Sequence, residues 1–266
     1  MKKFLLIFII MCCMSELTLG SAWVREKGEF FVSPSFYYYF ADKFYDKDGE
    51  KRPIGCTFRK KEVQLYGEYG LNNTTTATFK APYTWLSCGD KDNSGIGDVE
   101  IGIVKNLKRD RDSSLSLYGT FLVPTGYSIK DDLRLGYGRL GMEGGISYGL
   151  SGSWGFADVG AGYRHYFGYP SDQARGYMTV GLNLYKNLQL YGLLDAQIGL
   201  GNGKKKQVGQ NIFLETDYKL VQIYVGPRLM LGKTSLLLGY QKVIWGRNTG
   251  DGSGFFLGLW HAFRRH

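Results

Sequence analysis

The chain has 266 residues, of which 44% are hydrophobic and 21% charged, and its formal net charge is +9. Beyond its N-terminal segment it has no continuous apolar run of about 20 residues, the length that a membrane-spanning helix needs, which excludes a helical membrane protein. The Lys and Arg runs at 43–61, 105–111 and 204–206 lack the stacking platform or groove-reading helix of nucleic-acid binding, so we expect no nucleic-acid partner.

The N-terminal segment is typical of a secretory signal peptide. Lys2 and Lys3 precede an apolar run over Phe4–Met14, and small residues suited to signal peptidase stand at Gly20 and Ala22. The apolar run is too short to cross a membrane as a helix. We therefore predict a signal peptide over residues 1–22, followed by an exported β-barrel domain over residues 23–266.

Behind this segment, short stretches alternate apolar and polar side chains and end in turns. The stretch 114–123, for example, reads Ser-Leu-Ser-Leu-Tyr-Gly-Thr-Phe-Leu-Val. Only helices and closed barrels satisfy every backbone polar group inside a bilayer. Strands that are apolar on one face, in an exported chain, therefore predict an all-β, antiparallel transmembrane barrel in the bacterial outer membrane, surrounded by membrane lipids and lipopolysaccharide.

Twelve strands are the preferred count. The stretch 211–231 fits either one long strand or two strands that turn at Lys219–Leu220, so ten or fourteen strands are alternatives. Short connections at 71–73, 149–152, 186–187 and 232–233, and a longer one at 106–113, fit periplasmic turns. The connections at 41–57, 87–94, 124–136, 168–173, 201–210 and 246–253 fit extracellular loops. The expected strands cover 28–40, 58–70, 74–86, 97–107, 114–123, 137–149, 153–167, 174–186, 188–200, 211–231, 234–245 and 254–263.

Cys56 and Cys88 are the cysteines that follow the predicted signal peptide. They flank a predicted hairpin with its turn at Leu71–Asn73, and a turn centred on Asn72 places them opposite each other. Directly opposed Cβ atoms lie about 4.5–5.5 Å apart, close to disulfide geometry, and exported chains meet an oxidising compartment. We therefore predict a Cys56–Cys88 disulfide at the outer end of this hairpin.

The phase of the alternation sorts the mid-strand charges onto one face, which we assign to the lumen. Apolar neighbours such as Val63, Leu65 and Ile101 fall on the lipid face, where Lys or Arg costs about 2–4 kcal/mol at the midplane. Two interpretations stay open: the charges pair and fill the lumen, or they line a polar path that selects permeants. The candidate lumen-lining residues are Glu62, Glu68, Lys80, Glu100, Arg139, Glu143, Asp158, Arg164, Asp195 and Arg228.

The last expected strand, 255–263, ends near an aromatic residue and is similar to the C-terminal signal that the outer-membrane assembly machinery reads. The tail Arg264–His266 departs from the usual terminal Phe. We expect the assembly machinery to be a partner of this chain.

Three stretches together resemble a known family. They are Tyr66–Leu71 (Tyr-Gly-Glu-Tyr-Gly-Leu), Ser94–Gly102 (Ser-Gly-Ile-Gly-Asp-Val-Glu-Ile-Gly) and Leu122–Gly126 (Leu-Val-Pro-Thr-Gly). In order and spacing they are similar to the outer-membrane proteins grouped under the meta-pathway of phenol degradation. The resemblance implies a single barrel that passes small, often hydrophobic or aromatic compounds, and it implies no catalytic residues.

An enzyme is not expected. Hydrolytic barrels need a nucleophile with a base in reach, but His165 and His261 fall on the apolar face near strand ends and His266 is terminal. No metal-ligand spacing appears, so we expect no metal and no cofactor. The preferred function is facilitated diffusion of a small-molecule permeant through a channel or transporter. The alternative is a structural or adhesive barrel with a plugged lumen and functional loops.

Overall fold

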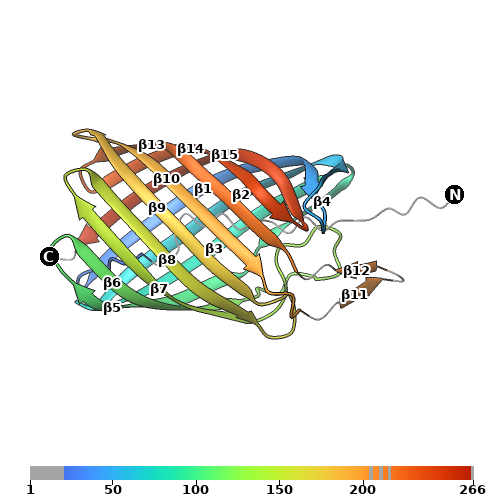
Figure 1. Cartoon of the computed structure of the whole chain (residues 1–266), viewed down its shortest axis with the longest axis horizontal. Helices are drawn as coiled ribbons and strands as arrows, with labels where there is room; N and C mark the ends of the chain where they lie inside the picture. The colour runs from blue at the N-terminus through green and yellow to red at the C-terminus, as the bar shows by residue number, and fades with distance from the viewer. Residues whose placement is uncertain (1–20, 204–205, 210–211, 215–216, 265–266) are drawn as a thin grey trace.

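The computed structural model describes residues 21–264 except 204–205, 210–211 and 215–216, and over these residues the chain forms a closed antiparallel β-barrel (Figure 1). In the same ranges, no helix is long and apolar enough to cross a membrane. The barrel is built from β1 (Glu29–Tyr45), β2 (Lys51–Asn72), β3 (Thr75–Cys88), β4 (Lys91–Ile96), β5 (Val99–Arg109), β6 (Ser113–Val123), β7 (Gly141–Gly152), β8 (Gly155–Tyr166), β9 (Gln173–Tyr185), β10 (Leu188–Gly199), β13 (Lys219–Leu231), β14 (Thr234–Arg247) and β15 (Thr249–Arg264).

The sheet closes because β1 pairs with β2 on one side and with the last strand, β15, on the other. Phe36 of β1 lies opposite Val63 of β2 and opposite Leu257 of β15. Every other barrel strand pairs with its neighbours along the chain. A closed sheet has no free edge, so its main-chain N–H and C=O groups are paired within the barrel, as a bilayer requires.

β4 and β5 act as one strand that is interrupted at Gly97–Asp98. Both pair with β3: Tyr83 lies opposite Ile96, and Lys80 lies opposite Glu100. The sheet contains thirteen segments, and two of them form this one interrupted strand. The barrel therefore has twelve strands, which confirms the predicted fold class and strand count.

Several predicted strand boundaries are wrong. The stretch 211–231 is not one strand, because β13 begins at Lys219, and β11 (Lys206–Gly209) and β12 (Ile212–Leu214) form a separate two-stranded sheet. The predicted loops 41–57 and 87–94 are mostly strand, because β1, β2, β3 and β4 continue their pairing there. The strand expected at 137–149 begins only at Gly141.

The two ends of the barrel differ. One end of the barrel, which we call the turn end, carries the last residue of β15 and five short turns, at 73–74, 110–112, 153–154, 186–187 and 232–233. The opposite end carries the longer connections and the β11–β12 sheet, and we call it the loop end (Figure 1). β2 has 22 residues, whereas about 9–11 residues cross a bilayer as a tilted strand. The long β1–β2 hairpin therefore extends past any membrane-crossing zone.

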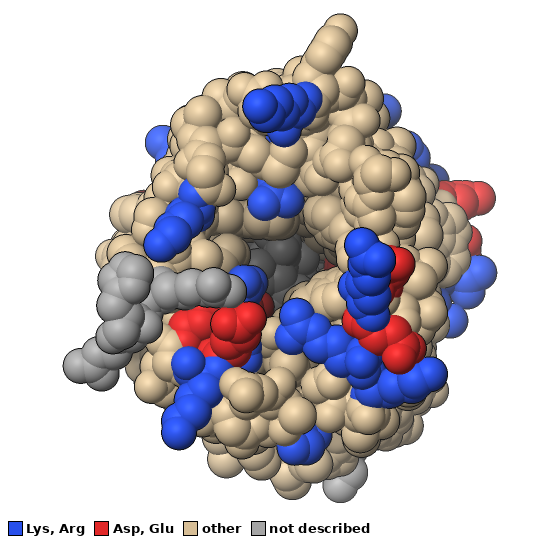
Figure 2. Space-filling view, turned by 90° about the vertical axis from the view of Figure 1, so that its left-hand side faces the viewer, with Lys and Arg blue, Asp and Glu red and all other residues tan. Residues whose placement is uncertain are grey.

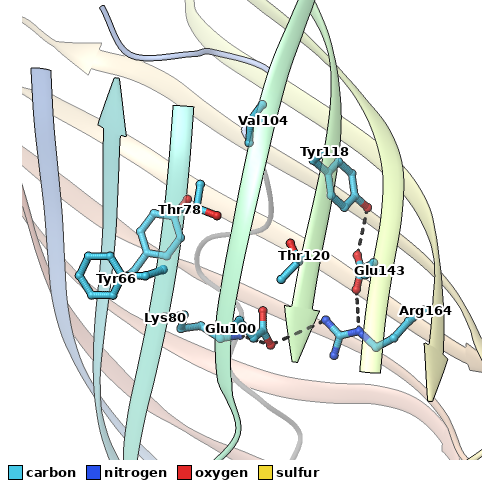
Figure 3. A pocket seen from close by; sticks show the side chains of 10 residues that line it. Tyr66, Thr78, Lys80, Glu100, Val104, Tyr118, Thr120, Glu143 and Arg164 are labelled. Carbon is cyan, nitrogen blue, oxygen red and sulfur yellow. Dashed lines mark hydrogen bonds and ion pairs between the residues drawn. The ribbon is translucent and has the colours of Figure 1, made fainter. Parts of the chain in front are cut away.

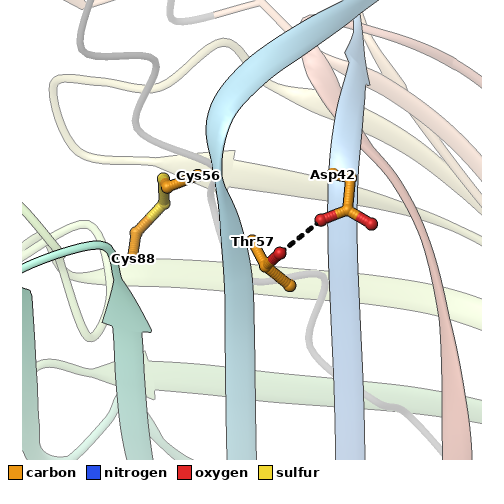
Figure 4. The surroundings of a disulfide bond; sticks show 4 residues. All are labelled: Asp42, Cys56, Thr57 and Cys88. Atoms are coloured by element: carbon orange, nitrogen blue, oxygen red, sulfur yellow. Dashed lines mark hydrogen bonds between the residues drawn. A yellow bond between two sulfur atoms is a disulfide. The ribbon is translucent and has the colours of Figure 1, made fainter.

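Cys56 and Cys88 form the predicted disulfide, with their Cα atoms 5.5 Å apart (Figure 4). The register from which we predicted it is wrong. The turn lies at 73–74, and the β2–β3 ladder pairs Arg59 with Ser87. If this register continued, Phe58 and not Cys56 would lie opposite Cys88.

The cysteines meet where β2 is irregular. Gly55 has a φ of 91°, a left-handed conformation that glycine adopts without steric cost. On the other side of β2, the pairing with β1 shifts between Phe58 and Pro53. The Thr57 hydroxyl donates to Asp42 of β1 at 2.6 Å within this irregular stretch (Figure 4). The backbone path of β2, rather than a regular ladder, brings Cys56 to Cys88.

Candidate functional site in the barrel lumen

The inner face of the barrel is polar and enclosed, whereas the outer face is apolar. On β2, Val63 and Leu65 are 45% and 43% exposed, and Glu62 and Gln64 are 3% and 2% exposed. Side chains alternate across a strand, so these two sets lie on opposite faces. Nine of the ten predicted lumen-lining residues, all except Arg139, lie in barrel strands with buried or half-buried side chains.

Four of these residues form an ion-pair wall along one side of the lumen (Figure 3). Lys80 Nζ lies 2.8 Å from Glu100 Oε1, and Arg164 Nε lies 2.6 Å from Glu143 Oε2. Arg164 Nη2 joins the two pairs at 3.8 Å from Glu100 Oε1. The Tyr118 hydroxyl donates to Glu143 at 3.1 Å. Two of these pairs join neighbouring strands, β3 with β5 and β7 with β8, and the contact of Arg164 with Glu100 links β8 to β5.

The ion-pair wall encloses little free space. The cavity beside Lys80, Glu100, Glu143 and Arg164 has a volume of about 30 Å³, which holds about one water molecule. Two cations balance two carboxylates here. Buried charges are tolerated when they are paired and hydrogen-bonded, so this arrangement explains why the chain carries both signs of charge on one face.

Asp195 organises a second polar group on β9, β10 and β13. Its Oδ1 lies 3.6 Å from Arg175 Nη2, and its Oδ2 accepts hydrogen bonds from Gln197 at 2.8 Å and Gln222 at 2.9 Å. The Asp195 side chain is fully buried. Gln197 also accepts a hydrogen bond from the Tyr218 hydroxyl at 2.7 Å.

Lys60 and Glu62 form a third pair, on β2. Lys60 Nζ lies 2.8 Å from Glu62 Oε2, and the Thr84 hydroxyl of β3 donates to the same oxygen at 2.9 Å. Sequence reasoning named Glu62 but not its partner Lys60, which is 3% exposed. Its position two residues from Glu62, on the same face of the strand, indicates the pairing.

Residues 21–28, which we call the N-terminal segment, enter the lumen at the turn end. Ala22 is 0% exposed. Its N–H donates to Asp158 Oδ2 at 2.8 Å, and its carbonyl accepts hydrogen bonds from the Ser114 and Ser116 hydroxyls at 2.6 and 2.7 Å. The Ser21 hydroxyl also donates to Asp158, at 3.3 Å. The inner wall therefore binds this extended backbone as it would bind a peptide.

Arg25 continues the attachment of the N-terminal segment. Its guanidinium forms an ion pair with Glu68 of β2, and its main-chain N–H donates to the Thr76 hydroxyl at 2.7 Å. The guanidinium also lies 4.3 Å from the centroid of the Phe31 ring. Val24 is 5% exposed and packs in a small apolar cluster of the inner wall. These contacts attach the segment to β2, β3, β5 and β6.

Residues 124–140, which we call the inward loop, close part of the loop end. Leu133 is 9% exposed, and its carbonyl accepts a hydrogen bond from Asn93 at 2.6 Å. A loop on the outside of the barrel could not bury this side chain within the inner wall. Leu133 packs in one apolar cluster with Tyr39, Ala41, Tyr45, Phe58, Leu86, Leu220 and Val243.

Tyr127 and Tyr137 anchor the inward loop. The Tyr127 hydroxyl donates to Asp98 and accepts a hydrogen bond from the Gly138 N–H at 2.6 Å. Burial first, and then the negative charge of Asp98, raise the pKa of Tyr127, so its hydroxyl stays protonated and continues to donate. The Tyr137 ring lies 4.9 Å from the Tyr166 ring, and the Tyr137 carbonyl accepts a hydrogen bond from Tyr169 at 2.8 Å.

Arg139 was predicted in a strand and lies instead in the inward loop. Its guanidinium stands 5.3 Å from the centroid of the Tyr169 ring. The alternation that assigned Arg139 to the lumen therefore began four residues early in the loop, because β7 starts at Gly141. Tyr137 packs against Tyr166 of β8 and against Tyr169, so this part of the chain lies on the inner wall instead of continuing β7.

A cavity of about 340 Å³ lies at the turn end, which we call the turn-end cavity. Figure 2 views this end, where the surface is hollowed and Lys and Arg side chains surround the opening on several sides. Its aromatic lining residues are Phe31, Tyr66, Phe156, Tyr177, Tyr191 and Trp260, and its charged ones are Arg25, Glu68, Asp158, Arg228 and Lys233. The turn-end cavity brings together three predicted lumen residues that lie far apart in sequence: Glu68, Asp158 and Arg228.

Sequence reasoning missed the N-terminal segment and the inward loop. Alternation begins at Glu29 and stops at Val123, so neither segment has a strand pattern. The contacts of both segments with the inner wall depend on a backbone path through the lumen, and local periodicity does not predict such a path. One available indication was Leu133, an apolar residue between the charged residues Asp132 and Arg134.

Comparison with known proteins gives the fold. No family model matches this chain, and no curated protein matches it. Among solved structures, it is similar to the COG4313 outer membrane channel from Pseudomonas putida F1, with a TM-score of 0.75 and 17% identity over 93% of this chain and 100% of that chain.

Two more distant structures have the same kind of barrel. The NanC porin gives a TM-score of 0.54 at 8% identity, covering 86% of this chain and 98% of that one. The translocator domain of the autotransporter NalP from Neisseria meningitidis gives 0.50 at 10% identity, covering 90% of each chain. The chain therefore has the fold of outer-membrane channels and porins.

Proposed function

We propose that this protein is an outer-membrane channel through which small molecules, including hydrophobic and aromatic ones, pass by facilitated diffusion. The turn end faces the periplasm and the loop end faces the outside, in keeping with the short turns of bacterial barrels. The resemblance of three sequence stretches to the family of the phenol meta-pathway supports this class of permeant.

The observation that carries the proposal is the aromatic turn-end cavity inside a closed barrel. Ligand sites are commonly concave and mostly apolar, with few polar groups that fix orientation. A barrel with only a structural role needs no such space, and in eight-stranded barrels side chains fill the interior. Here Tyr191 and Trp260 border open space instead of filling it.

The permeation path would run between the ion-pair wall and the Asp195 group. Neither the N-terminal segment nor the inward loop is part of the sheet. Each is attached by a limited set of contacts, so either can move while the barrel stays intact. Displacement of these two segments would widen the lumen, which leaves little free space beside the ion-pair wall in this structure.

A second function, a structural barrel with a plugged lumen, is favoured by one observation. The free space beside the ion-pair wall is only about 30 Å³. In that case the ion pairs would act as packing, and the protein would pass nothing.

Reconstitution distinguishes the two functions. Purified protein in liposomes is tested for uptake of benzenesulfonate and phenyltrimethylammonium, aromatic solutes whose fixed charge prevents them from crossing lipid unaided. A channel raises the uptake of at least one of them above protein-free liposomes. Uptake equal to that of protein-free liposomes for both solutes, with no conductance in planar bilayers, would support the plugged barrel.

A further inference from the structure

We propose that the turn-end cavity binds small aromatic carboxylates, and that Arg228 holds their carboxylate group. This rests on the proposed function in one respect, because the aromatic carboxylate bound there would be a permeant of the channel. The binding itself follows from the charges and rings of the cavity and is tested separately from permeation.

Arg228 differs from the other lumen cations. Lys80, Arg164 and Arg175 each lie within 4.0 Å of a carboxylate oxygen. Over the residues that the structure describes, no carboxylate oxygen lies within that distance of Arg228. Its Nη1 donates to Gln189 at 3.1 Å and its Nη2 to Ser235 at 3.1 Å.

The guanidinium of Arg228 keeps capacity for a ligand. Its Nε is buried and has no hydrogen-bond partner within the described part of the chain. An arginine side chain has five N–H donors in a planar fork that matches a carboxylate. A charged group removed from water without a counter-charge is unfavourable. A ligand carboxylate at the guanidinium would supply the missing counter-charge.

The acidic groups of the cavity are already engaged. Glu68 pairs with Arg25 and accepts a hydrogen bond from Tyr66 at 2.8 Å. Asp158 accepts hydrogen bonds from the Ala22 N–H and from the Tyr177 hydroxyl at 2.9 Å. The lining has three cations, Arg25, Arg228 and Lys233, and two carboxylates, so its net charge is +1.

An aromatic wall lies directly beside this charge. The Trp260 ring centroid is 4.4 Å from the Arg228 guanidinium carbon. Tyr191 and Phe31 contact Trp260 edge-on, with ring centroids 5.8 and 6.2 Å away. A ligand ring beside these side chains would gain the edge-on or offset contacts that aromatic pairs prefer. The volume of about 340 Å³ falls within the range of about 300–1,000 Å³ that is usual for small-molecule sites.

The cavity should therefore select an aromatic carboxylate over a neutral aromatic of the same shape. A benzamide fits the same space but supplies no counter-charge to Arg228. The difference in dissociation constant should be at least about tenfold, the effect expected for a hydrogen bond to a charged group.

The test measures 19F NMR titrations of 4-fluorobenzoate and 4-fluorobenzamide against the purified full-length protein in detergent at pH 7.5. The variant Arg228→Gln removes the charge and keeps an amide that can still contact Gln189 and Ser235. Lys186→Gln is the matched control, because it removes one positive charge from an exposed turn at the same end, outside the cavity. Heat-dependent migration in gel electrophoresis checks that each variant is a folded barrel.

We expect wild type to bind the benzoate at least tenfold more tightly than the benzamide. Arg228→Gln should raise the dissociation constant of the benzoate about tenfold and leave that of the benzamide nearly unchanged, whereas Lys186→Gln should change neither. Equal affinities of wild type for the two ligands overturn the proposal, even if Arg228→Gln does not fold. An unchanged benzoate affinity in folded Arg228→Gln also overturns it.

The outcome is separable from the proposed function. If solutes permeate liposomes but wild type does not prefer the benzoate, the binding site is refuted and the channel stands. If the benzoate binds through Arg228 but nothing permeates, the channel is refuted and the site stands.

Discussion

The Ala22 N–H donates to Asp158 Oδ2 at 2.8 Å, although 136 positions separate the two residues in sequence. Asp158 also accepts hydrogen bonds from the Ser21 and Tyr177 hydroxyls. Ala22 lies in the N-terminal segment, and Asp158 lies on the inner wall in β8. This one carboxylate therefore holds the start of the described chain inside the lumen.

Asp158→Asn should loosen the N-terminal segment and raise single-channel conductance. Loss of a hydrogen bond to a charged group costs about 1.5–3 kcal/mol, which reduces the docked-to-undocked ratio about ten- to hundredfold. Asp195→Asn is the control, because it removes one negative charge from the lumen without a contact to the segment. Equal conductance changes in the two variants would assign the effect to charge and not to the segment.

We expect cleavage before Ser21, two residues earlier than the end of the signal peptide that the sequence predicts over residues 1–22. Cleavage before Ser21 keeps the contacts of Ser21 and Ala22 with Asp158, Ser114 and Ser116, whereas cleavage before Trp23 removes them. Intact-mass spectrometry of protein purified from outer membranes gives the answer directly. A mass that starts at Trp23 would contradict the attachment of the N-terminal segment described above.

Leu133→Asp should displace the inward loop and increase conductance from the loop end. Burial of a leucine side chain contributes about 1.5–3 kcal/mol, and a carboxylate in the same apolar cluster must lose its hydration. Ser128→Asp adds the same charge at an exposed position of the same loop and should leave conductance unchanged. If both variants conduct like wild type, the inward loop does not obstruct the path.

Glu100→Gln should shift ion selectivity toward anions. The substitution leaves Lys80 without its carboxylate at 2.8 Å and makes the ion-pair wall more positive. Reversal potentials in a salt gradient measure the shift. Glu50→Gln, at an exposed position of the β1–β2 connection, serves as the control. Unchanged selectivity in Glu100→Gln would mean that permeating ions do not pass the wall.

Asp172 should make the loop end sensitive to acid. Burial raises the pKa of Asp172. The opposing effects are larger, so that the pKa is lowered: the carboxylate accepts hydrogen bonds from Tyr163, Asn202 and the Tyr166 N–H, and it lies near the charge of His165. Its stabilising effect is therefore complete above the ordinary Asp pKa of about 3.9 and is lost as pH falls through the lowered value.

The measurement compares thermal unfolding of wild type and Asp172→Asn at pH 6 and at pH 3. Wild type should be the more stable at pH 6, and the difference should shrink at pH 3. A difference of the same size at both pH values would show that the Asp172 carboxylate contributes nothing through its charge.

Local patterns in the sequence predict the barrel but not the contents of its lumen. Alternation of apolar and polar residues predicts β2 as a strand. The positions of Glu62 and Val63 in that alternation predict which side chains face the lumen and which face lipid, because side chains alternate between the two faces of a strand. The Cys56–Cys88 disulfide could be predicted although the register was two residues off, since the oxidising compartment and the hairpin matter more than exact opposition.

Contacts that depend on the closed barrel could not be predicted. Leu133 packs against strands that lie on both sides of its own loop in sequence, and Ala22 bonds to β6 and β8 at once. The same limit explains Arg139: alternation continued into a loop whose path is set by packing of Tyr137 against Tyr166. The positions of the N-terminal segment and the inward loop can be explained only from the closed barrel, because their contacts lie on several of its strands.

The central claim is that the lumen is a path for small molecules, and single-channel recording of wild type and Asp158→Asn in planar bilayers tests it most directly. The account predicts discrete conductance steps for wild type and larger steps for Asp158→Asn. Folded, inserted protein that is electrically silent in both forms would contradict it and would leave a plugged, structural barrel.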